Sequence, residues 1–340
     1  MTMSNEVVLS VKNLSVVFHT PDGDVAAVTD VSFELSSGET LGIVGESGSG
    51  KSVTASSIMR LNNSVTASTT GSILVSGVDV LTADESEVRR IRGSEVAMIF
   101  QDPLSALNPY YTVGNQIAEA YLVHHPHVSK SDARAVSLEM LKKVGIPNPE
   151  KRIDEFPHQF SGGMRQRIVI AIALINNPKV LIADEPTTAL DVTVQAQILD
   201  LMRELQAEFN MAIVLITHDL GVIAEAAKDV LVMYGGRVVE RSTVDALFSE
   251  PTHPYAWGLL GAVNSLGNSG RGALATIAGS PPSLIALPRG CSFHPRCAYV
   301  SDTCRTDVPM LRAIGRKGSV TACHLPDGEI LSIGQQMASQ

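Results

Sequence analysis

The chain contains no run of about 18 uninterrupted apolar residues, the length that a membrane-spanning helix needs, so we expect no such helix. It has no excess of basic residues either: 26 Lys and Arg against 35 Asp and Glu give a formal net charge of -9. Because nucleic-acid backbones are bound by clustered Lys and Arg, this balance argues against a nucleic-acid partner. The first residues show no basic stretch ahead of an apolar run, so we expect no secretory signal and a cytosolic compartment.

Cysteine is absent until late in the chain, where four residues occur together: Cys291, Cys297, Cys304 and Cys323. In a reducing compartment such a cluster is more typical of a metal or cofactor site, or of free thiols, than of a disulfide framework. The 340 residues are 44% hydrophobic and 18% charged, which indicates an ordinary globular protein. This length suits one large domain with an appendage, or two modest domains.

The hydropathy pattern predicts an α/β fold. Alternating residues at 8–18 and 28–35, with a turn signal at 21–24, predict an antiparallel β subdomain. Short apolar runs predict buried strands of a mixed sheet at residues 40–44, 95–100, 179–183 and 212–217. Helical patterns predict an insertion over about residues 102–176, including a helical stretch at 111–145, and a helix at 192–209. A hairpin is predicted at 229–241.

The composition changes near Glu250, where proline and glycine become frequent. We therefore expect one domain over residues 1–250 and a loop-rich C-terminal extension over 251–340, which carries the four cysteines.

A phosphate-binding loop follows the strand predicted at 40–44 and precedes a helical run. Its residues are Gly45, Glu46, Ser47, Gly48, Ser49, Gly50, Lys51 and Ser52, followed by Val53. The pattern Gly-x4-Gly-Lys-Ser lets backbone N–H groups converge on phosphate oxygens, places Lys51 near the β and γ phosphates and lets Ser52 ligate Mg²⁺. Because both flanking elements are correct, the motif predicts an ATP site; a chance match in a Gly/Ser-rich loop is the alternative.

Two further motifs carry groups suited to phosphate chemistry. The apolar strand at 179–183 ends in Asp184, which suits a magnesium shell, and Glu185, which suits polarising an attacking water. Ser161, Gly162 and Gly163 begin another helical stretch, and a helix N-terminus of this kind binds anions. Taken alone, the first of these motifs fits an acidic turn after a strand as well as it fits a catalytic site.

Together these residues resemble the ATP-binding-cassette transporter ATPases over roughly residues 8–245. Ser161, Gly162 and Gly163 are similar to the signature motif of that family, and Gln101 to its Q-loop. Ala189, Leu190 and Asp191 are similar to its D-loop, His218 to its switch histidine and Phe18 to its adenine-stacking aromatic. Met164 departs from the broad consensus, which has Gln there; we expect hydrolysis to survive this change.

Motifs in the C-terminal extension indicate which branch of that family the chain resembles. The run Glu-Pro-Thr-His-Pro-Tyr at 250–255, Gly-Ser-Pro-Pro at 279–282, and the residues around Pro295, Arg296 and Cys297 resemble the dipeptide and oligopeptide importer branch, as does Met164. Within that branch the chain is similar to the first of the two ATPase subunits. Importers of nickel, glutathione and some oligosaccharides share these features, so related substrates remain alternatives.

The resemblance implies an ATPase that energises a membrane importer of peptides. Lys51, Glu185, His218 and Gln101 would serve hydrolysis, while Ser52, Gln101 and Asp184 would hold Mg²⁺. Ser161, Gly162 and Gly163 would cap ATP bound by a second ATP-binding subunit in a heterodimer, so the isolated subunit should hydrolyse ATP weakly. Two permease subunits and an extracytoplasmic substrate-binding protein would complete the assembly, with this chain peripheral at the cytoplasmic face of the membrane. A soluble nucleotide-switched ATPase and a non-hydrolysing regulatory module are the alternatives.

The cysteine spacing, Cys-x5-Cys-x6-Cys-x18-Cys, does not fit the short knuckles typical of structural zinc. Four thiolates suit a [4Fe–4S] cluster, and the resemblance supports one, because some peptide-importer ATPases carry such a cluster here. Zinc, free thiols and disulfides stay open as alternatives, and His294 or His324 could replace one ligand.

Overall fold

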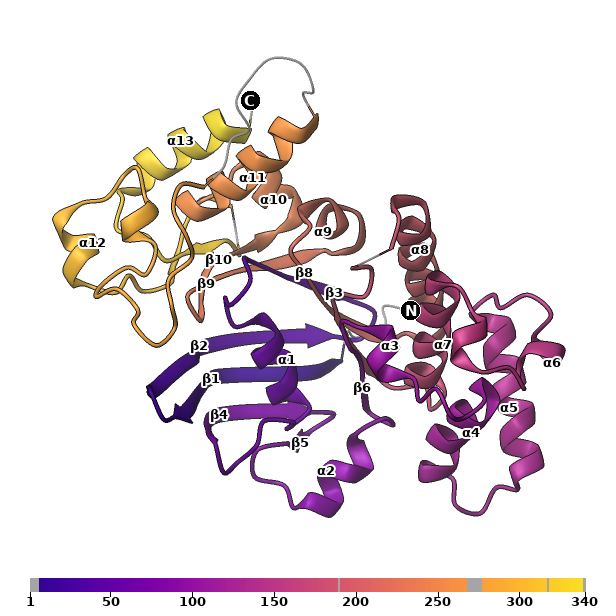
Figure 1. Ribbon diagram of the computed structural model, residues 1–340. Coiled ribbons are helices and arrows are strands. Elements are labelled where there is room, and N and C mark those ends of the chain that lie inside the picture. Colours follow the sequence, from indigo (N-terminus) through magenta and orange to yellow (C-terminus); the bar gives the residue numbers. More distant parts are fainter. Residues whose placement is uncertain (1–5, 189, 268–276, 317, 339–340) are drawn as a thin grey trace. The chain divides into compact units, whose positions relative to one another are not determined.

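The structure is a computed structural model that describes residues 6–188, 190–267, 277–316 and 318–338 (Figure 1). Its internal contacts divide the chain into two compact units, and each is described by itself. The first unit comprises residues up to Ser10, Glu34–Glu39 and Leu74–Val214. The second comprises Val11–Phe33, Thr40–Ile73 and the residues from Leu215 onward.

The first unit is mainly helical. Its elements are β5 (Val78–Asp79), α2 (Glu85–Ile91), β6 (Val96–Ile99), α3 (Pro103–Ala106), α4 (Val113–His124), α5 (Lys130–Lys143), α6 (Pro149–Arg152), the 3-10 turn η1 (Pro157–Gln159), α7 (Gly162–Leu174), β7 (Val180–Asp184), α8 (Val192–Phe209) and the first residues of β8 (Ala212–Thr217). β6 and β7 pair in parallel. Every residue of β7 is buried, which its continuous apolar sequence predicts for a strand covered on both faces.

The helices expected between residues 102 and 176 are present, but the stretch at 111–145 is not one helix. It forms α4 and α5, which pack against each other (Figure 1). Pro126 lies between them, and proline disfavours helical backbone in the residue before it, here His125. Ser129 then caps α5, its side chain accepting a hydrogen bond from the backbone N–H of Asp132 at 3.2 Å.

The second unit combines two sheet regions with short helices. Its elements are most of β1 (Val7–Thr20), β2 (Gly23–Ser36) and β4 (Ala67–Val75), then β3 (Thr40–Val44), α1 (Lys51–Ile58), α9 (Leu220–Ala226), β9 (Asp229–Tyr234), β10 (Arg237–Thr243), α10 (Val244–Ser249), α11 (Pro254–Gly267), the 3-10 turn η2 (His294–Arg296), α12 (Asp302–Thr306), β11 (Arg312–Ala313), β12 (Val320–Thr321) and α13 (Asp327–Ala338). β2, β1 and β4 lie side by side in that order (Figure 1). β3 pairs in parallel with β9, which pairs antiparallel with β10.

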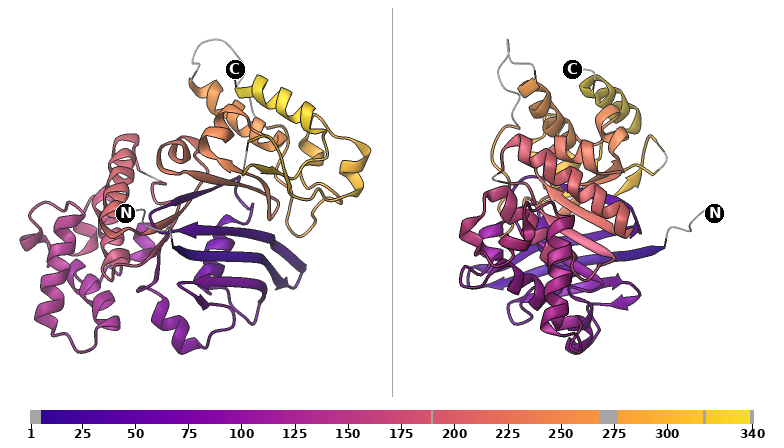
Figure 2. Two further views of the ribbon diagram at one scale, coloured as in Figure 1. Left: turned by 180° about the vertical axis from the view of Figure 1, so that it is seen from behind. Right: turned by 90° about the vertical axis from the view of Figure 1, so that its right-hand side faces the viewer.

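The C-terminal extension contains more regular structure than its sequence predicts. β12 pairs antiparallel with β10, with Thr321 opposite Glu240, and β11 pairs with β12. α11 and α13 lie next to each other in both figures and contact each other (Figures 1 and 2). Trp257, Ile314 and Ile330 form a small buried core of this region. The division predicted near residue 250 stays a prediction.

No helix among the described residues has the length and apolar character to cross a membrane.

Candidate ATP-binding site

The phosphate-binding loop joins β3 to α1 in the second unit. Gly50 stands immediately before α1 with φ 100°, in the left-handed region, and a Cβ there would lie 2.5 Å from the carbonyl oxygen of Ala27. A Cβ on Gly45 would lie 2.2 Å from the carbonyl oxygen of Met233. The loop therefore follows its path only with glycine at both positions, because the neighbouring backbone occupies the space of any side chain.

The side chain of Lys51 packs against the phosphate-binding loop. Its side-chain Nζ donates hydrogen bonds to the carbonyl oxygens of Gly45 (2.7 Å) and Glu46 (3.0 Å) and to Oγ of Ser49 (3.4 Å). Only 6% of Lys51 is exposed, whereas Ser52 beside it is exposed. The ammonium group is thus held at the loop, where the backbone N–H groups of the first turn of α1 also lie, and positive charge collects there.

Two residues of the C-terminal extension hold Glu46, and sequence reasoning missed both. The backbone N–H of Glu46 donates to the hydroxyl of Tyr255 at 2.8 Å. The Glu46 carboxylate accepts two hydrogen bonds from Arg296, at 2.7 and 3.1 Å. A signal for them existed in the sequence, where both fall within the motifs that mark the extension, but their distance from the loop along the chain hid the contact.

Phe18 and His218 also belong to the second unit. Phe18 is half-buried near the end of β1, and His218 is exposed directly after β8. Asp219, the next residue, caps α9 by accepting a hydrogen bond from the backbone N–H of Gly221 at 2.7 Å. His218 therefore follows the strand that the sequence predicts, and its side chain is exposed there.

In the first unit, Gln101 and Glu185 come together. The side-chain Nε2 of Gln101 donates to Oε2 of Glu185 at 2.8 Å, and the hydroxyl of Thr188 donates to the same oxygen at 2.9 Å. Glu185 has φ 49°, a left-handed conformation that few non-glycine residues adopt. Asp184 precedes it at the end of β7 and is 6% exposed. Sequence reasoning found all of this group except Thr188.

The signature residues form the start of α7 in the same unit. Ser161 caps the helix, its hydroxyl accepting from the backbone N–H of Met164 at 3.4 Å. A Cβ on Gly163 would lie 2.6 Å from Cγ1 of Val194, near the start of α8, while one on Gly162 would make only an ordinary contact. Asp191 caps α8 by accepting from the backbone N–H of Val194 at 2.9 Å. Ala189, the first residue of the predicted D-loop, lies outside the described residues.

The four cysteines lie close enough to affect one another but carry no disulfide. Burial raises the pKa of Cys291 and of Cys323 to about 11 each, and the neighbouring sulfurs add to this shift. Burial also raises the pKa of Cys297. Within the described parts of the chain, no three His, Cys, Asp or Glu side chains are arranged to hold a metal ion. The predicted iron–sulfur site therefore finds no support in this geometry.

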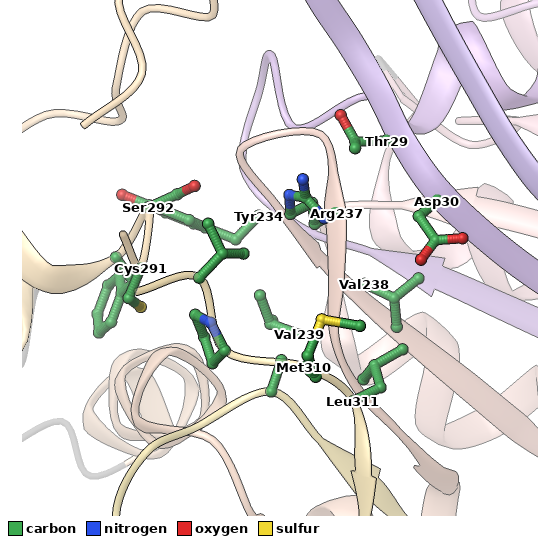
Figure 3. Close-up of a pocket in the computed structure, with 14 residues that line it drawn as sticks. Thr29, Asp30, Tyr234, Arg237, Val238, Val239, Cys291, Ser292, Met310 and Leu311 are labelled. Atoms are coloured by element: carbon green, nitrogen blue, oxygen red, sulfur yellow. The ribbon is translucent and has the colours of Figure 1, made fainter. Parts of the chain in front are cut away.

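Cys291 also lines a cavity of about 230 Å³ in the second unit (Figure 3). The lining is largely apolar, with Val238, Met310 and Leu311 from β10 and the extension, and it includes the charged residues Asp30 and Arg237 (Figure 3). This cavity is distinct from the phosphate-binding loop, whose own shallow depression is bounded by residues 46–49, Tyr234, Gly235, Pro281 and Pro282.

A mixed α/β unit that carries a phosphate-binding loop, and a helical unit that carries the Gln101, Glu185 and Ser161 groups, together define an ATP-binding cassette. Comparison with known proteins agrees. The ABC transporter family matches residues 28–188, and the family described as "Oligopeptide/dipeptide transporter, C-terminal region" matches residues 239–304.

Individual relatives match over most of their length. The oligopeptide transport ATP-binding protein OppD of Salmonella typhimurium is 50% identical over 325 residues, which cover 96% of each chain. The dipeptide transport ATP-binding protein DppD of Lactococcus lactis is 52% identical over 86% of this chain and 84% of its own. A solved post-hydrolysis dimer of the ATP-binding cassette MJ0796, bound to ADP and phosphate, superimposes with a TM-score of 0.62 at 27% identity, covering 69% of this chain and 98% of that one. The chain belongs to the ABC transporter family of ATP-binding proteins, and the expected P-loop ATPase fold is confirmed.

Proposed function

We propose that this chain is the ATP-hydrolysing subunit of a membrane importer of dipeptides or oligopeptides. The observation that carries the proposal is the phosphate-binding loop with Lys51 held inside it, in a chain half identical to oligopeptide transport ATP-binding proteins over nearly its whole length. The matching C-terminal region supports peptides as the substrate class over nickel, glutathione or oligosaccharides.

In this proposal the residues of the phosphate-binding loop bind ATP. The backbone N–H groups at residues 45–53 and the ammonium of Lys51 contact the β and γ phosphates, and Phe18 stacks on the adenine. Glu185 orients the attacking water, and its carboxylate is well suited because Gln101 and Thr188 fix one of its oxygens. His218 steadies the γ-phosphate. With these roles, loss of the side chain of Lys51, Glu185 or His218 should lower ATP turnover without unfolding the chain.

Each of the two units offers oxygen donors that suit Mg²⁺, which prefers hard oxygen ligands. Ser52 is exposed in the first turn of α1, and Asp184 presents a carboxylate at the end of β7. We assign Ser52, Asp184 and Gln101 as the residues that hold the ion. When bound, Mg²⁺ neutralises phosphate charge.

We further propose a heterodimer with a second ATP-binding subunit. Ser161, Gly162 and Gly163 would cap ATP on the partner, a role that the exposure of Ser161 and Gly162 permits. Two permease subunits and an extracytoplasmic binding protein complete the importer, and the chain sits peripherally at the cytoplasmic face of the membrane. The isolated chain should then hydrolyse ATP weakly, because each ATP needs residues from both subunits.

The test is ATP-driven uptake of a labelled oligopeptide into vesicles that contain the assembled importer. Lys51→Ala should abolish uptake and ATP hydrolysis, whereas Glu204→Gln, an exposed change on α8, should alter neither. Peptide uptake that persists in Lys51→Ala would refute the proposal. Nickel, glutathione and an oligosaccharide serve as competitors, and inhibition by one of these but not by peptides would assign a different substrate.

For the four cysteines we propose a [4Fe–4S] cluster, a proposal that rests on their number, because such a cluster takes four thiolate ligands. An anaerobic preparation should contain about four irons per chain and absorb visible light as iron–thiolate complexes do. Cys297→Ser should lower both signals. A colourless preparation without iron, with four titratable thiols, would refute the cluster.

A further inference from the structure

Arg296 belongs to the four-cysteine segment, residues 291–323, yet its side chain reaches the phosphate-binding loop. It is the last residue of η2 and directly precedes Cys297. The guanidinium is nearly buried, with 6% of the side chain exposed, and forms a two-pronged ion pair with Glu46, the second residue of the loop. Paired hydrogen bonds of this kind fix direction as well as distance, because both planar groups must align.

Every N–H group of the Arg296 guanidinium has an acceptor. Besides the two bonds to Glu46, Nη1 donates to the hydroxyl of Tyr234 at 3.3 Å, Nη2 to the carbonyl of Ile277 at 3.2 Å, and Nε to the carbonyl of Ala278 at 2.9 Å. A guanidinium offers five N–H donors, so none is left for a ligand. This arrangement indicates a fixed structural element and excludes direct phosphate binding by Arg296.

Glu46 is held at each of its polar groups. Its carboxylate is bound by Arg296, its backbone N–H by the hydroxyl of the fully buried Tyr255, and its carbonyl oxygen by Lys51. Two of these three partners come from the C-terminal extension. The third is the residue expected to contact the phosphates, so a change in the position of Glu46 moves an acceptor of Lys51.

Three aromatic side chains, Tyr234, Tyr255 and Phe293, pack together beside the Arg296–Glu46 pair. Phe293, two residues after Cys291, packs edge-on against Tyr234 at 5.1 Å between ring centroids and lies 5.5 Å from the ring of Tyr255. The segment therefore contacts the loop through a buried layer that resists rearrangement. Disturbing the fold around Cys291 or Cys297 would displace Arg296 and, with it, Glu46.

We propose that Arg296 is a positioning residue for the phosphate-binding loop, acting through Glu46, so that the ATP affinity of the cassette depends on the folded four-cysteine segment. The proposal rests on ATP binding at the loop. It goes beyond the proposed function because it assigns the extension a role in nucleotide binding. A ligand or chemical change at the segment would then alter ATP affinity without touching the nucleotide.

The test compares Arg296→Gln, Arg296→Lys, Glu46→Gln and the Glu46→Gln/Arg296→Gln pair with Arg305→Gln. Arg305 is exposed on α12 in the same segment, so its variant is a matched control. ATP affinity is measured by calorimetry on the full chain, and KM and kcat for ATP on the assembled importer.

We expect Arg296→Gln to raise the Kd and KM for ATP about tenfold or more, the scale of a lost charge-assisted bond, with a smaller change in kcat. Arg296→Lys should restore part of the affinity, because it keeps the charge but not the paired geometry. The double variant should bind ATP no more weakly than the worse single variant, because the two changes remove one interaction.

Glu46→Gln protects the test against misfolding of the segment, since it leaves residues 291–323 unchanged. If all variants bind ATP like Arg305→Gln, or if the two single effects simply add, the proposal is wrong. Wild-type chain that binds no ATP at all would instead overturn the proposed function.

Discussion

The side-chain amide of Gln101 donates a 2.8 Å hydrogen bond to Oε2 of Glu185, across 84 positions of sequence. Thr188 donates to the same oxygen, so two side chains hold this carboxylate oxygen in place. A carboxylate held in this way suits a group that orients water and accepts its proton.

Replacing Glu185 by Gln should therefore lower ATP turnover of the assembled importer by at least about a hundredfold, the usual scale for losing a general base. ATP binding should persist, because the amide keeps an oxygen for Gln101 and Thr188. The measurements are phosphate release and ATP affinity. The control is Glu204→Gln, the same substitution at an exposed position of α8. Equal turnover in the two variants would remove Glu185 from the mechanism.

The glycines of the phosphate-binding loop offer a second prediction, because two of them differ in surroundings. A Cβ at Gly50 meets the Ala27 carbonyl oxygen at 2.5 Å, whereas one at Gly48 meets nothing within 4 Å. Both have positive φ, at 100° and 77°, so both alanine variants carry backbone strain on the order of 1 kcal/mol.

Only Gly50→Ala adds a collision with backbone, so it should lose ATP binding beyond detection and lower Tm by several degrees. Gly48→Ala should remain folded with the smaller loss of stability. Thermal unfolding and ATP calorimetry separate the two. If the two variants lose ATP affinity equally, the positive φ that both glycines share, and not the collision at Gly50, would be the cause of the loss.

The sequence predicts those parts of the fold and the site whose pattern lies within one short segment of the chain. The phosphate-binding loop, β8 and α8 appear where their patterns predict, because a motif or an amphipathic period lies within each segment. β11 and β12 contain two residues each and show no period, so the pairing of β12 with β10 and of β11 with β12 could not be predicted. The Arg296–Glu46 pair spans 250 positions and consists of two ordinary charged residues, a contact that only the folded chain reveals.

Glu240 gives stability a predicted dependence on pH. It is fully buried on β10, and one carboxylate oxygen accepts hydrogen bonds from the backbone N–H groups of Thr252 (2.9 Å) and His253 (2.7 Å), just before α11. Burial raises the pKa of Glu240 to about 8, against the opposing effect of these N–H groups. Burial also lowers the pKa of His253 to about 3.

The two groups act in different pH windows. The raised pKa of Glu240 means that the folded chain keeps a proton that the unfolded chain loses, so stability is lost as pH rises from about 4.5 toward 8. Because the pKa of His253 is lowered, the unfolded chain binds a proton that the folded chain does not bind. The folded chain therefore loses stability through His253 only as pH falls below about 6.5. Between pH 6.5 and 8, Glu240 acts alone.

Over that interval the free energy of unfolding should fall by about 2 kcal/mol, taking 1.36 kcal/mol for each pH unit. Glu240→Gln should abolish most of this fall, whereas Glu329→Gln, on the exposed first turn of α13, should keep it. Chemical denaturation at the two pH values measures the difference. A wild-type chain of constant stability would mean that Glu240 is ionised when folded.

Gly162 and Gly163 provide a matched pair at the start of α7. A Cβ on Gly163 would lie 2.6 Å from Cγ1 of Val194, whereas one on Gly162 would stand 3.8 Å from Leu190. Gly163→Ala should therefore push α7 from the start of α8 and destabilise the isolated chain by about 1–3 kcal/mol, the usual cost of overpacking. Gly162→Ala should change stability little. Removing the obstructing methyl groups in Gly163→Ala/Val194→Ala should restore part of the loss in chemical denaturation, and a double variant that is less stable than Gly163→Ala would show that the collision is not the cause.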